Sequence, residues 1–179
     1  MPAPNGIVIV VMLLVAAGAG GAADTARSDD PFAPLRVLEG VWHGEGRGFG
    51  QTSKVTHEWE TVLGGRFMRL KTRSVTRGAD GTESIHEDVG YVSWSEGERV
   101  LRFRQFLSEG FVNTFRITVV ESPAAGLDFE PESTEGNADL VARLTLRFGR
   151  SGGYEMVLEL GSKGAPLKVC QTMTLTRAR

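Results

Sequence analysis

Hydrophobic and polar residues alternate along most of the chain. The clearest stretch is 140–148, where Leu140, Ala142, Leu144, Leu146 and Phe148 alternate with Val141, Arg143, Thr145 and Arg147. Successive side chains of a β-strand point to opposite faces, so this period of two predicts a strand with one buried face. Only 34–40 has features of a helix, with a proline suited to a first turn, a glycine suited to a stop, and Leu35 and Leu38 on one side.

The same alternation predicts the inward side chains of six further strands. They are Val55, His57, Trp59 and Thr61; Met68, Leu70, Thr72 and Ser74; Leu101, Phe103, Gln105 and Leu107; Phe111, Asn113, Phe115, Ile117 and Val119; Tyr154, Met156, Leu158 and Leu160; and Val169, Gln171, Met173 and Leu175. A two-residue hairpin is expected at Gly64-Gly65. The pattern also predicts a short strand at 127–129, and a strand at 84–94 whose faces it does not orient.

About ten strands joined by hairpin-sized turns, with no crossover helices between them, predict an antiparallel meander. Closing such a meander removes its exposed edges. The outward set carries charged residues that face lipid only at high cost, which disfavours an outer-membrane barrel. These are Arg102, Arg104, Arg143, Arg147, Glu155 and Glu159. The predicted fold class is all-β, a single up-and-down antiparallel β-barrel with a short N-terminal helical turn.

The segment 40–48 is predicted to be the first strand of this barrel. It places Trp42, Gly44, Gly46 and Gly48 on one face. A large aromatic side chain can plug one end of a barrel, and the glycines can let the strand bend or leave space inside.

The N-terminus predicts secretion. Residues 7–15 form an unbroken apolar run, followed by small residues and then by polar ones, as in a secretory signal peptide. The run is too short and too rich in alanine and glycine for a membrane span, so no integral span is expected in the mature chain. The expected organisation is a signal peptide at 1–23, a polar lead-in at 24–34 and a barrel domain at 35–179, in a secreted or periplasmic protein.

Composition narrows the function. A net charge of −2 over 179 residues argues against a nucleic-acid partner, which requires a concentrated basic surface. The single cysteine, Cys170, excludes an internal disulfide and a thiolate zinc cage. Neither observation distinguishes a monomer from a homodimer.

Four polar residues interrupt the inward apolar sets: His57, Gln105, Asn113 and Gln171. Burying such groups without partners costs about 1–3 kcal/mol each, so they must meet one another, water or a ligand. A structural hydrogen-bond network is one interpretation, and a wet cavity is the other. We expect a ligand-binding cavity walled by Trp42, His57, Trp59, Met68, Gln105, Asn113, Phe115 and Gln171.

Other constellations give no catalytic or metal assignment. His43 with Glu45, and His86 with Asp88, share strand faces that we interpret as outward and solvated. Cys170 is placed on an outer face without a histidine on its strand, which disfavours a nucleophile.

The Gly40-x-Trp42 pair after a helical turn, the Gly44-x-Gly46-x-Gly48 run and the segment Leu63-Gly64-Gly65-Arg66-Phe67 resemble small lipocalin-like proteins of the calycin group. Within that group the chain is most similar to ten-stranded nitrobindin and fatty-acid-binding-protein-like barrels and to related uncharacterised bacterial families. The resemblance implies a hydrophobic ligand or haem inside the barrel. Nitrobindins hold haem through a histidine near the C-terminal end, whereas His43, His57 and His86 all lie in the first half of this chain.

The sequence therefore predicts a secreted or periplasmic barrel that binds a small, mostly hydrophobic molecule. One alternative is an enzyme, either a haem-dependent isomerase of nitrobindin type or a cyclase-like barrel that uses His57 as an acid–base group. A further alternative is a structural barrel with a filled core.

Overall fold

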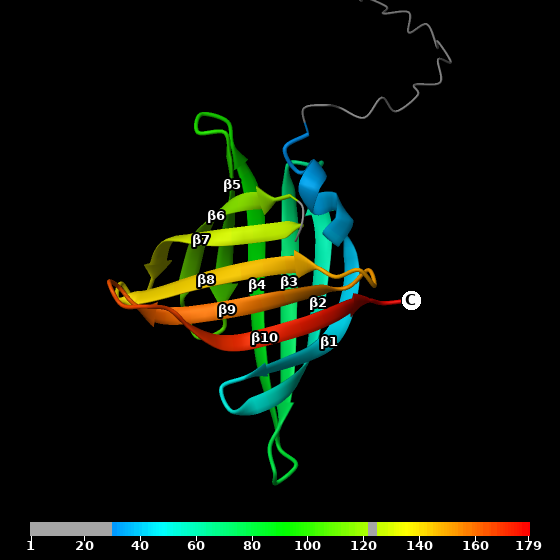
Figure 1. Cartoon of the computed structure of the whole chain (residues 1–179), viewed down its shortest axis with the longest axis vertical. Helices are drawn as coiled ribbons and strands as arrows, with labels where there is room; N and C mark the ends of the chain where they lie inside the picture. Colours follow the sequence, from blue (N-terminus) through cyan, green and yellow to red (C-terminus); the bar gives the residue numbers. More distant parts are fainter. Residues whose placement is uncertain (1–29, 122–124) are drawn as a thin grey trace, which may run out of the picture. The chain divides into compact units, whose positions relative to one another are not determined.

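The computed structural model describes residues 30–121 and 125–179. Ten antiparallel strands form one closed barrel, in which each strand pairs with its sequence neighbours and β1 pairs with β10 (Figure 1). The short 3-10 helix η1 (Ala33–Leu38) precedes them. The strands are β1 (Gly40–Gly48), β2 (Gln51–Val62), β3 (Phe67–Arg77), β4 (Glu83–Ser95), β5 (Val100–Leu107), β6 (Val112–Val120), β7 (Gly126–Glu135), β8 (Leu140–Phe148), β9 (Tyr154–Ser162) and β10 (Lys168–Arg177). The predicted fold class is confirmed.

Residues 31–179 form one compact unit, in which Phe32 is only 4% exposed. The predicted signal peptide at 1–23 lies outside the described residues, and of the predicted lead-in only its last part, from residue 30, is described.

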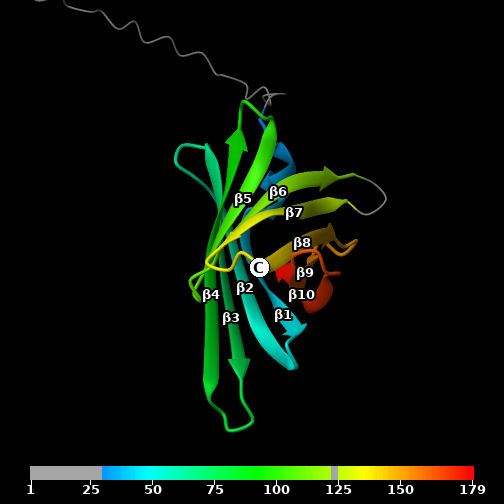
Figure 2. The same ribbon diagram turned by 90° about the vertical axis from the view of Figure 1, so that its left-hand side faces the viewer.

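The buried face of the alternating pattern is the inside of the barrel. Trp59, Met68 and Leu146, from three different strands, are 2% exposed or less. Seen from the side, the long strands β3 and β4 form one wall, and β8, β9 and β10 lie across the barrel from it (Figure 2). The inward sets of β2, β3, β5, β8 and β9 predicted from the sequence are therefore confirmed.

The glycines of β1 allow this strand to lie unusually close to β10. A Cβ atom on Gly44 would sit 1.8 Å from the carbonyl oxygen of Thr174, and one on Gly48 would sit 2.2 Å from that of Cys170. A Cβ on Gly46 would meet the Ser53 hydroxyl at 2.8 Å. Neighbouring atoms therefore occupy the Cβ positions of these glycines, and Gly48 also borders the internal cavity.

The helix η1 closes one end of the barrel. Leu35 and Leu38 are fully buried, as the predicted helical turn requires. Arg177 at the end of β10 donates hydrogen bonds to the carbonyl oxygens of Val37 (2.6 Å) and Glu39. Its guanidinium carbon also lies 4.5 Å from the centre of the Trp42 ring, a cation–π arrangement. Arg177 thus joins η1, β1 and β10 where the barrel closes.

Three local predictions differ from the structure. Val62 pairs with Phe67, so four residues, not two, connect β2 to β3, and Leu63 takes a positive φ angle there. A β-bulge between Val169 and Gln171 turns Val169 outward, and it is 63% exposed instead of buried. Val119 was predicted to be inward but is 40% exposed near the end of β6.

β7 is also longer than the predicted segment 127–129. It pairs with β6 throughout, but with β8 only from Gly126 to Phe129. Beyond Phe129 the strand carries Pro131 beside a bulge, and proline is tolerated at such an edge position because no partner needs its N–H. Glutamates and a proline hid this half of the strand from the sequence pattern.

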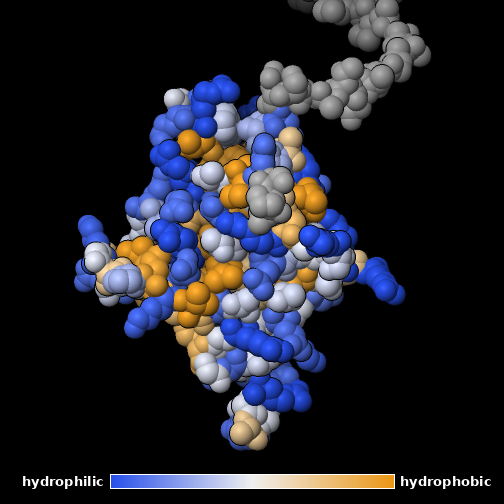
Figure 3. All heavy atoms as spheres, viewed as in Figure 1, coloured by the Kyte–Doolittle hydropathy of each residue, from blue (hydrophilic) through white to orange (hydrophobic). Residues whose placement is uncertain are grey.

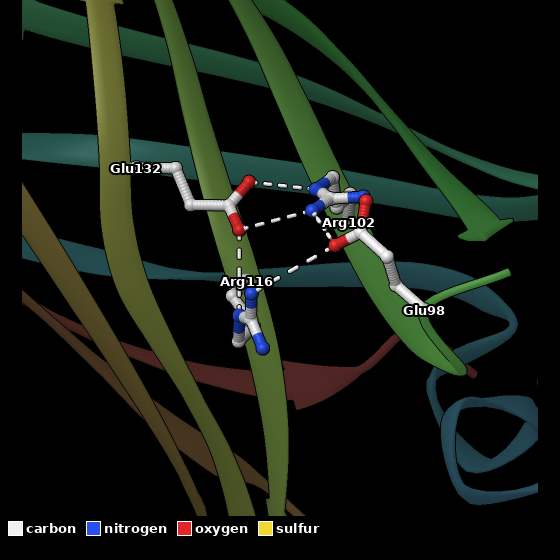
Figure 4. A network of polar contacts seen from close by, with 4 residues as sticks. All are labelled: Glu98, Arg102, Arg116 and Glu132. Atoms are coloured by element: carbon white, nitrogen blue, oxygen red, sulfur yellow. Dashed lines mark hydrogen bonds and ion pairs between the residues drawn. The ribbon is translucent and has the colours of Figure 1, made fainter.

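The outer surface carries charged residues that pair across neighbouring strands. Arg102 on β5 donates to Glu132 on β7 at 2.7 Å and also pairs with Glu98, while Arg116 on β6 donates to Glu132 at 3.3 Å (Figure 4). Arg104 pairs with Glu135 at 2.8 Å. The outward orientation predicted for the β5 arginines is confirmed. Such exposed pairs contribute up to about 1 kcal/mol each.

The face shown in Figure 3 is largely hydrophilic, with hydrophobic side chains gathered between the charged ones over parts of β8, β9 and β10. Across residues 30–121 and 125–179 no helix is both long and apolar enough to cross a membrane.

Candidate ligand-binding cavity

A cavity of about 490 Å³ lies inside the barrel, at the end away from η1. Strand ends near this opening supply Phe49, Gln51, Thr76 and Phe111 to its wall. The β1–β2 and β3–β4 turns lie at this lower end of Figure 1, whereas η1 lies at the upper right. The volume falls within the range of about 300–1,000 Å³ that is usual for small-molecule sites.

Packed aromatic side chains close the end beside η1. Trp42 and Tyr154 meet edge to face with ring centres 4.8 Å apart, and the Trp42 Nε1–H donates to the carbonyl oxygen of Leu38 at 2.6 Å. Phe103 packs against Phe115 and Phe129 at 6.0 Å and 5.5 Å. These rings form the floor of the cavity, and Phe103 is the member that also lines it.

His57 lies where the aromatic floor meets the cavity, and three side chains are connected there. The Trp59 Nε1–H donates to the Tyr154 hydroxyl at 3.3 Å, and that hydroxyl lies 2.7 Å from His57 Nδ1. The hydroxyl can accept from Trp59 and donate its own proton to His57 Nδ1 at the same time, and we assign this arrangement, which leaves the His57 proton on Nε2. Burial lowers the pKa of His57 to about 4 against a smaller opposing effect of Asp88, so the imidazole is neutral at pH 7.

A second polar group is found on β4 and the following hairpin. His86 Nε2 lies 3.6 Å from Asp88 Oδ2, an ion-pair distance that is too long for a hydrogen bond, and His86 Nδ1 lies 2.7 Å from Glu109 Oε1. Asp88, and then Glu109, raise the pKa of His86 to about 9, although partial burial opposes this. At neutral pH His86 is therefore an imidazolium between two carboxylates.

The interpretation of His86 and Asp88 as outward and solvated is wrong. Asp88 is 5% exposed, and both side chains line the cavity. The reason is the register of β4, in which Asp88 pairs with Thr72 on the inner face of β3. His43, by contrast, is exposed as predicted, with its Nδ1 3.1 Å from the Thr56 hydroxyl.

The structure brings together the four polar residues singled out from the sequence. His57, Gln105, Asn113 and Gln171 all line the cavity, and Asn113 accepts a hydrogen bond from Thr134 at 3.0 Å. Of the other four predicted wall residues, Trp42, Trp59, Met68 and Phe115 are 2% exposed or less and belong to the packed core. They are not among the residues that line the cavity. Ligand binding by any of the eight stays a prediction.

Several polar residues of the cavity wall were not predicted from the sequence to line a cavity. They are Ser53, Thr72, Ser74, Thr76, His86, Asp88 and Glu109. Small hydroxyl residues at inward positions resemble ordinary strand composition, which hides them. Asp88 could have been found by its parity, since it shares a face with Val92, which is fully buried.

Ser108, His86 and Asp88 are the residue types of a hydrolytic triad, but the histidine cannot act as the general base that such a triad needs. The Ser108 hydroxyl lies 3.5 Å from His86 Nδ1, the same nitrogen that Glu109 approaches at 2.7 Å. A general base needs a free lone pair, and an imidazolium has none. Among the described residues no group of three or more potential ligands could hold a metal ion.

In the assigned hydrogen-bond arrangement no imidazole of the cavity wall is free to hold a haem iron. On β10 the side chains that reach the cavity are Gln171 and Met173. His86 pairs with carboxylates at both ring nitrogens. His57 turns Nδ1 to Tyr154 and carries its proton on Nε2 in the assignment above. In this arrangement neither imidazole offers iron a lone pair, and a haem at His57 would require the other tautomer, with Nδ1–H donating to the Tyr154 hydroxyl.

Comparison with solved structures identifies similar barrels. The crystal structure of Rv2717c from M. tuberculosis matches with a TM-score of 0.65 and 18% identity, over 83% of this chain and 98% of that one. A de novo designed fluorescence-activating β-barrel, at 14% identity over 78% of this chain and 93% of its own, reaches a TM-score of only 0.36 and supports no argument. The likeness to Rv2717c shows the fold alone, a closed antiparallel β-barrel. No family model and no curated protein matches the sequence.

Proposed function

We propose that this protein binds a small, mostly hydrophobic molecule inside its barrel. The observation that carries the proposal is the cavity of about 490 Å³, whose apolar wall is interrupted by convergent polar side chains. Leu70, Leu144, Met156, Leu158 and Met173 supply an apolar surface for the body of such a molecule. This combination is typical of small-molecule sites in β-barrels.

The cavity favours ligand binding over a purely structural barrel. Protein interiors are close-packed, and voids larger than a water molecule are few. An interior of this volume forfeits packing contacts that a filled core would gain. His57 could serve an enzyme as an acid–base group, but among the described residues its buried and neutral imidazole has only the Tyr154 hydroxyl as a hydrogen-bond partner. Binding is therefore the better-supported function.

Secretion or periplasmic localisation is part of the proposal and is supported by the apolar run at 7–15. We expect the mature protein to begin between Gly20 and Thr25, because signal peptidases cut after small residues that follow such a run. N-terminal sequencing of protein from the secreted or periplasmic fraction checks this. Recovery of Met1 or Pro2 as the first residue from that fraction would contradict it.

Replacing Gln105 or Asn113 by leucine tests the cavity wall. We expect each change to weaken binding of the neutral fluorophore N-phenyl-1-naphthylamine, or of the ligand extracted with the protein, by about 0.5–3 kcal/mol. Each removes a polar partner in the cavity, whereas stability should change less because leucine suits an apolar wall. Fluorescence titration measures the affinity for the fluorophore, and mass spectrometry of the extract measures how much ligand each variant retains. Urea denaturation measures the stability.

Thr118→Val, on the exposed outer face of β6, is the matched control and should leave binding unchanged. If both cavity variants bind the fluorophore as tightly as the unaltered protein, the polar residues are only a core network and the proposed site is wrong.

A further inference from the structure

We propose that the polar end of the ligand is a hydroxyl group held between His57 and Asp88, and that the cavity discriminates against carboxylates. This inference rests on the proposed function and adds the chemical class of the ligand. It follows from two unsatisfied atoms, their positions in the sheet and the charges around them.

Four buried side-chain polar atoms lack a hydrogen-bond partner in the described part of the chain, and two of them belong to residues that line the cavity: Nε2 of His57 and Oδ1 of Asp88. The two residues are only 1% and 5% exposed, and both line the cavity. An unsatisfied buried donor or acceptor costs about 1–3 kcal/mol, so folded proteins rarely leave one without a role. Here one donor and one acceptor are left at the same cavity.

The sheet register places these two residues in one row. His57 on β2 pairs with Thr72 on β3, which in turn pairs with Asp88 on β4. With neighbouring strands about 4.8 Å apart, their Cα atoms are separated by about 10 Å and their side chains face the same interior. The two side chains do not bond to each other. A small group lying between them can contact both.

The chemistry of the two atoms selects the group. His57 presents an N–H donor in the tautomer set by Tyr154, whereas a carboxylate such as Asp88 only accepts. A hydroxyl accepts from the first and donates to the second. An ammonium group cannot accept, and a ligand carboxylate cannot donate.

The charges of the wall also act against a carboxylate ligand. Among the described residues that line the cavity there is no arginine or lysine, and the carboxylates of Asp88 and Glu109 both face His86. An incoming carboxylate would meet two negative groups and a single imidazolium already paired with both. Burying an uncompensated charge is strongly unfavourable. A fatty acid is therefore a poor ligand, and a hydrophobic alcohol or phenol is a good one.

Displacement of N-phenyl-1-naphthylamine at pH 7.5 by 1-decanol, decylamine and decanoate, which share one hydrocarbon body, tests the inference. We expect decanol to displace the fluorophore with a Kd at least tenfold below that of decanoate, and also below that of decylamine, whose ammonium cannot accept from His57. In Asp88→Asn the amide can donate to a carboxylate, so the preference for decanol over decanoate should fall at least fivefold. Glu87→Gln, the exposed neighbour on the outer face of β4, should leave the preference unchanged.

The outcomes separate the two proposals. If the fluorophore binds but decanoate competes as well as decanol, the hydroxyl inference is overturned and the binding function stands. If the three heads compete equally, an ordered water satisfies His57 and Asp88 and the inference is likewise overturned. If neither the fluorophore nor any decyl compound binds, both proposals are overturned. The order in which decanol, decylamine and decanoate compete for the unaltered protein tests the hydroxyl inference even if Asp88→Asn fails to fold.

Discussion

Replacing Trp42 by alanine is expected to lower the free energy of unfolding by about 3–5 kcal/mol, as truncation of large core aromatics does. The side chain is 2% exposed, contacts the edge of Tyr154 and donates to the carbonyl oxygen of Leu38. The guanidinium of Arg177 packs over the Trp42 ring and donates a hydrogen bond to the carbonyl oxygen of Val37 in η1. One substitution therefore removes contacts among η1, β1, β9 and β10.

Urea denaturation followed by circular dichroism measures this loss. Trp42→Phe should retain the ring contact with Tyr154 but not the hydrogen bond to Leu38, and so fall between the alanine variant and the unaltered protein. Trp94→Ala is the matched control, because Trp94 is only partly buried and donates to the exposed Glu96 at 2.6 Å. An unfolding midpoint that hardly moves in Trp42→Ala would show that the aromatic floor does not hold the barrel closed.

Most of the fold could be predicted from the sequence because alternation reports burial directly. On β8, Leu144 and Leu146 are buried while Arg143 and Arg147 between and beside them pair with carboxylates on neighbouring strands. A closed barrel with one apolar interior leaves each such strand a single possible orientation. The orientation of such a strand can therefore be predicted without knowing which residues on the neighbouring strands it contacts.

The pattern failed where a backbone irregularity or an inward charge breaks the rule. By alternation with Gln171, Val169 is expected to face the core, but the bulge before Gln171 turns it outward. No residue type in this segment indicates that a bulge is present. On β4 the inward set includes Asp88, while Ile85 and Tyr91 lie on the outside with exposures of 50% and 36%. An orientation chosen by hydrophobicity is wrong for such a strand.

The lack of a clean apolar set on β4 explains why His86 and Asp88 were not predicted to line the cavity. The polar residues predicted for the cavity interrupt clean apolar sets, and this made Gln105 and Gln171 conspicuous. Asp88 and His86 lie on a strand without a clean set, so the strand pairing with Thr72 was needed to place them inside. Residues that depart from the local pattern are expected at functional sites.

The buried imidazole of His57 predicts a loss of stability in acid. Its pKa is lowered from 6.5 to about 4 by burial, so between these pH values the unfolded chain binds a proton that the folded protein does not. The free energy of unfolding must then fall as the pH falls from about 6.5 to 4, by on the order of 3 kcal/mol from this group. His57→Gln, which does not titrate, should lose this part of the pH dependence.

Urea titrations of the unaltered protein and His57→Gln at several pH values between 7 and 4 measure the difference, in which the carboxylates common to both proteins cancel. His86 acts in the opposite direction and in another window: its pKa is raised to about 9, so its stabilisation is complete below 6.5 and is lost as the pH rises through 9. His86→Gln should therefore change the alkaline side of the stability profile and leave the acid side intact. Parallel profiles for His57→Gln and the unaltered protein below pH 6.5 would mean that the imidazole reaches solvent and that the floor of the cavity is open.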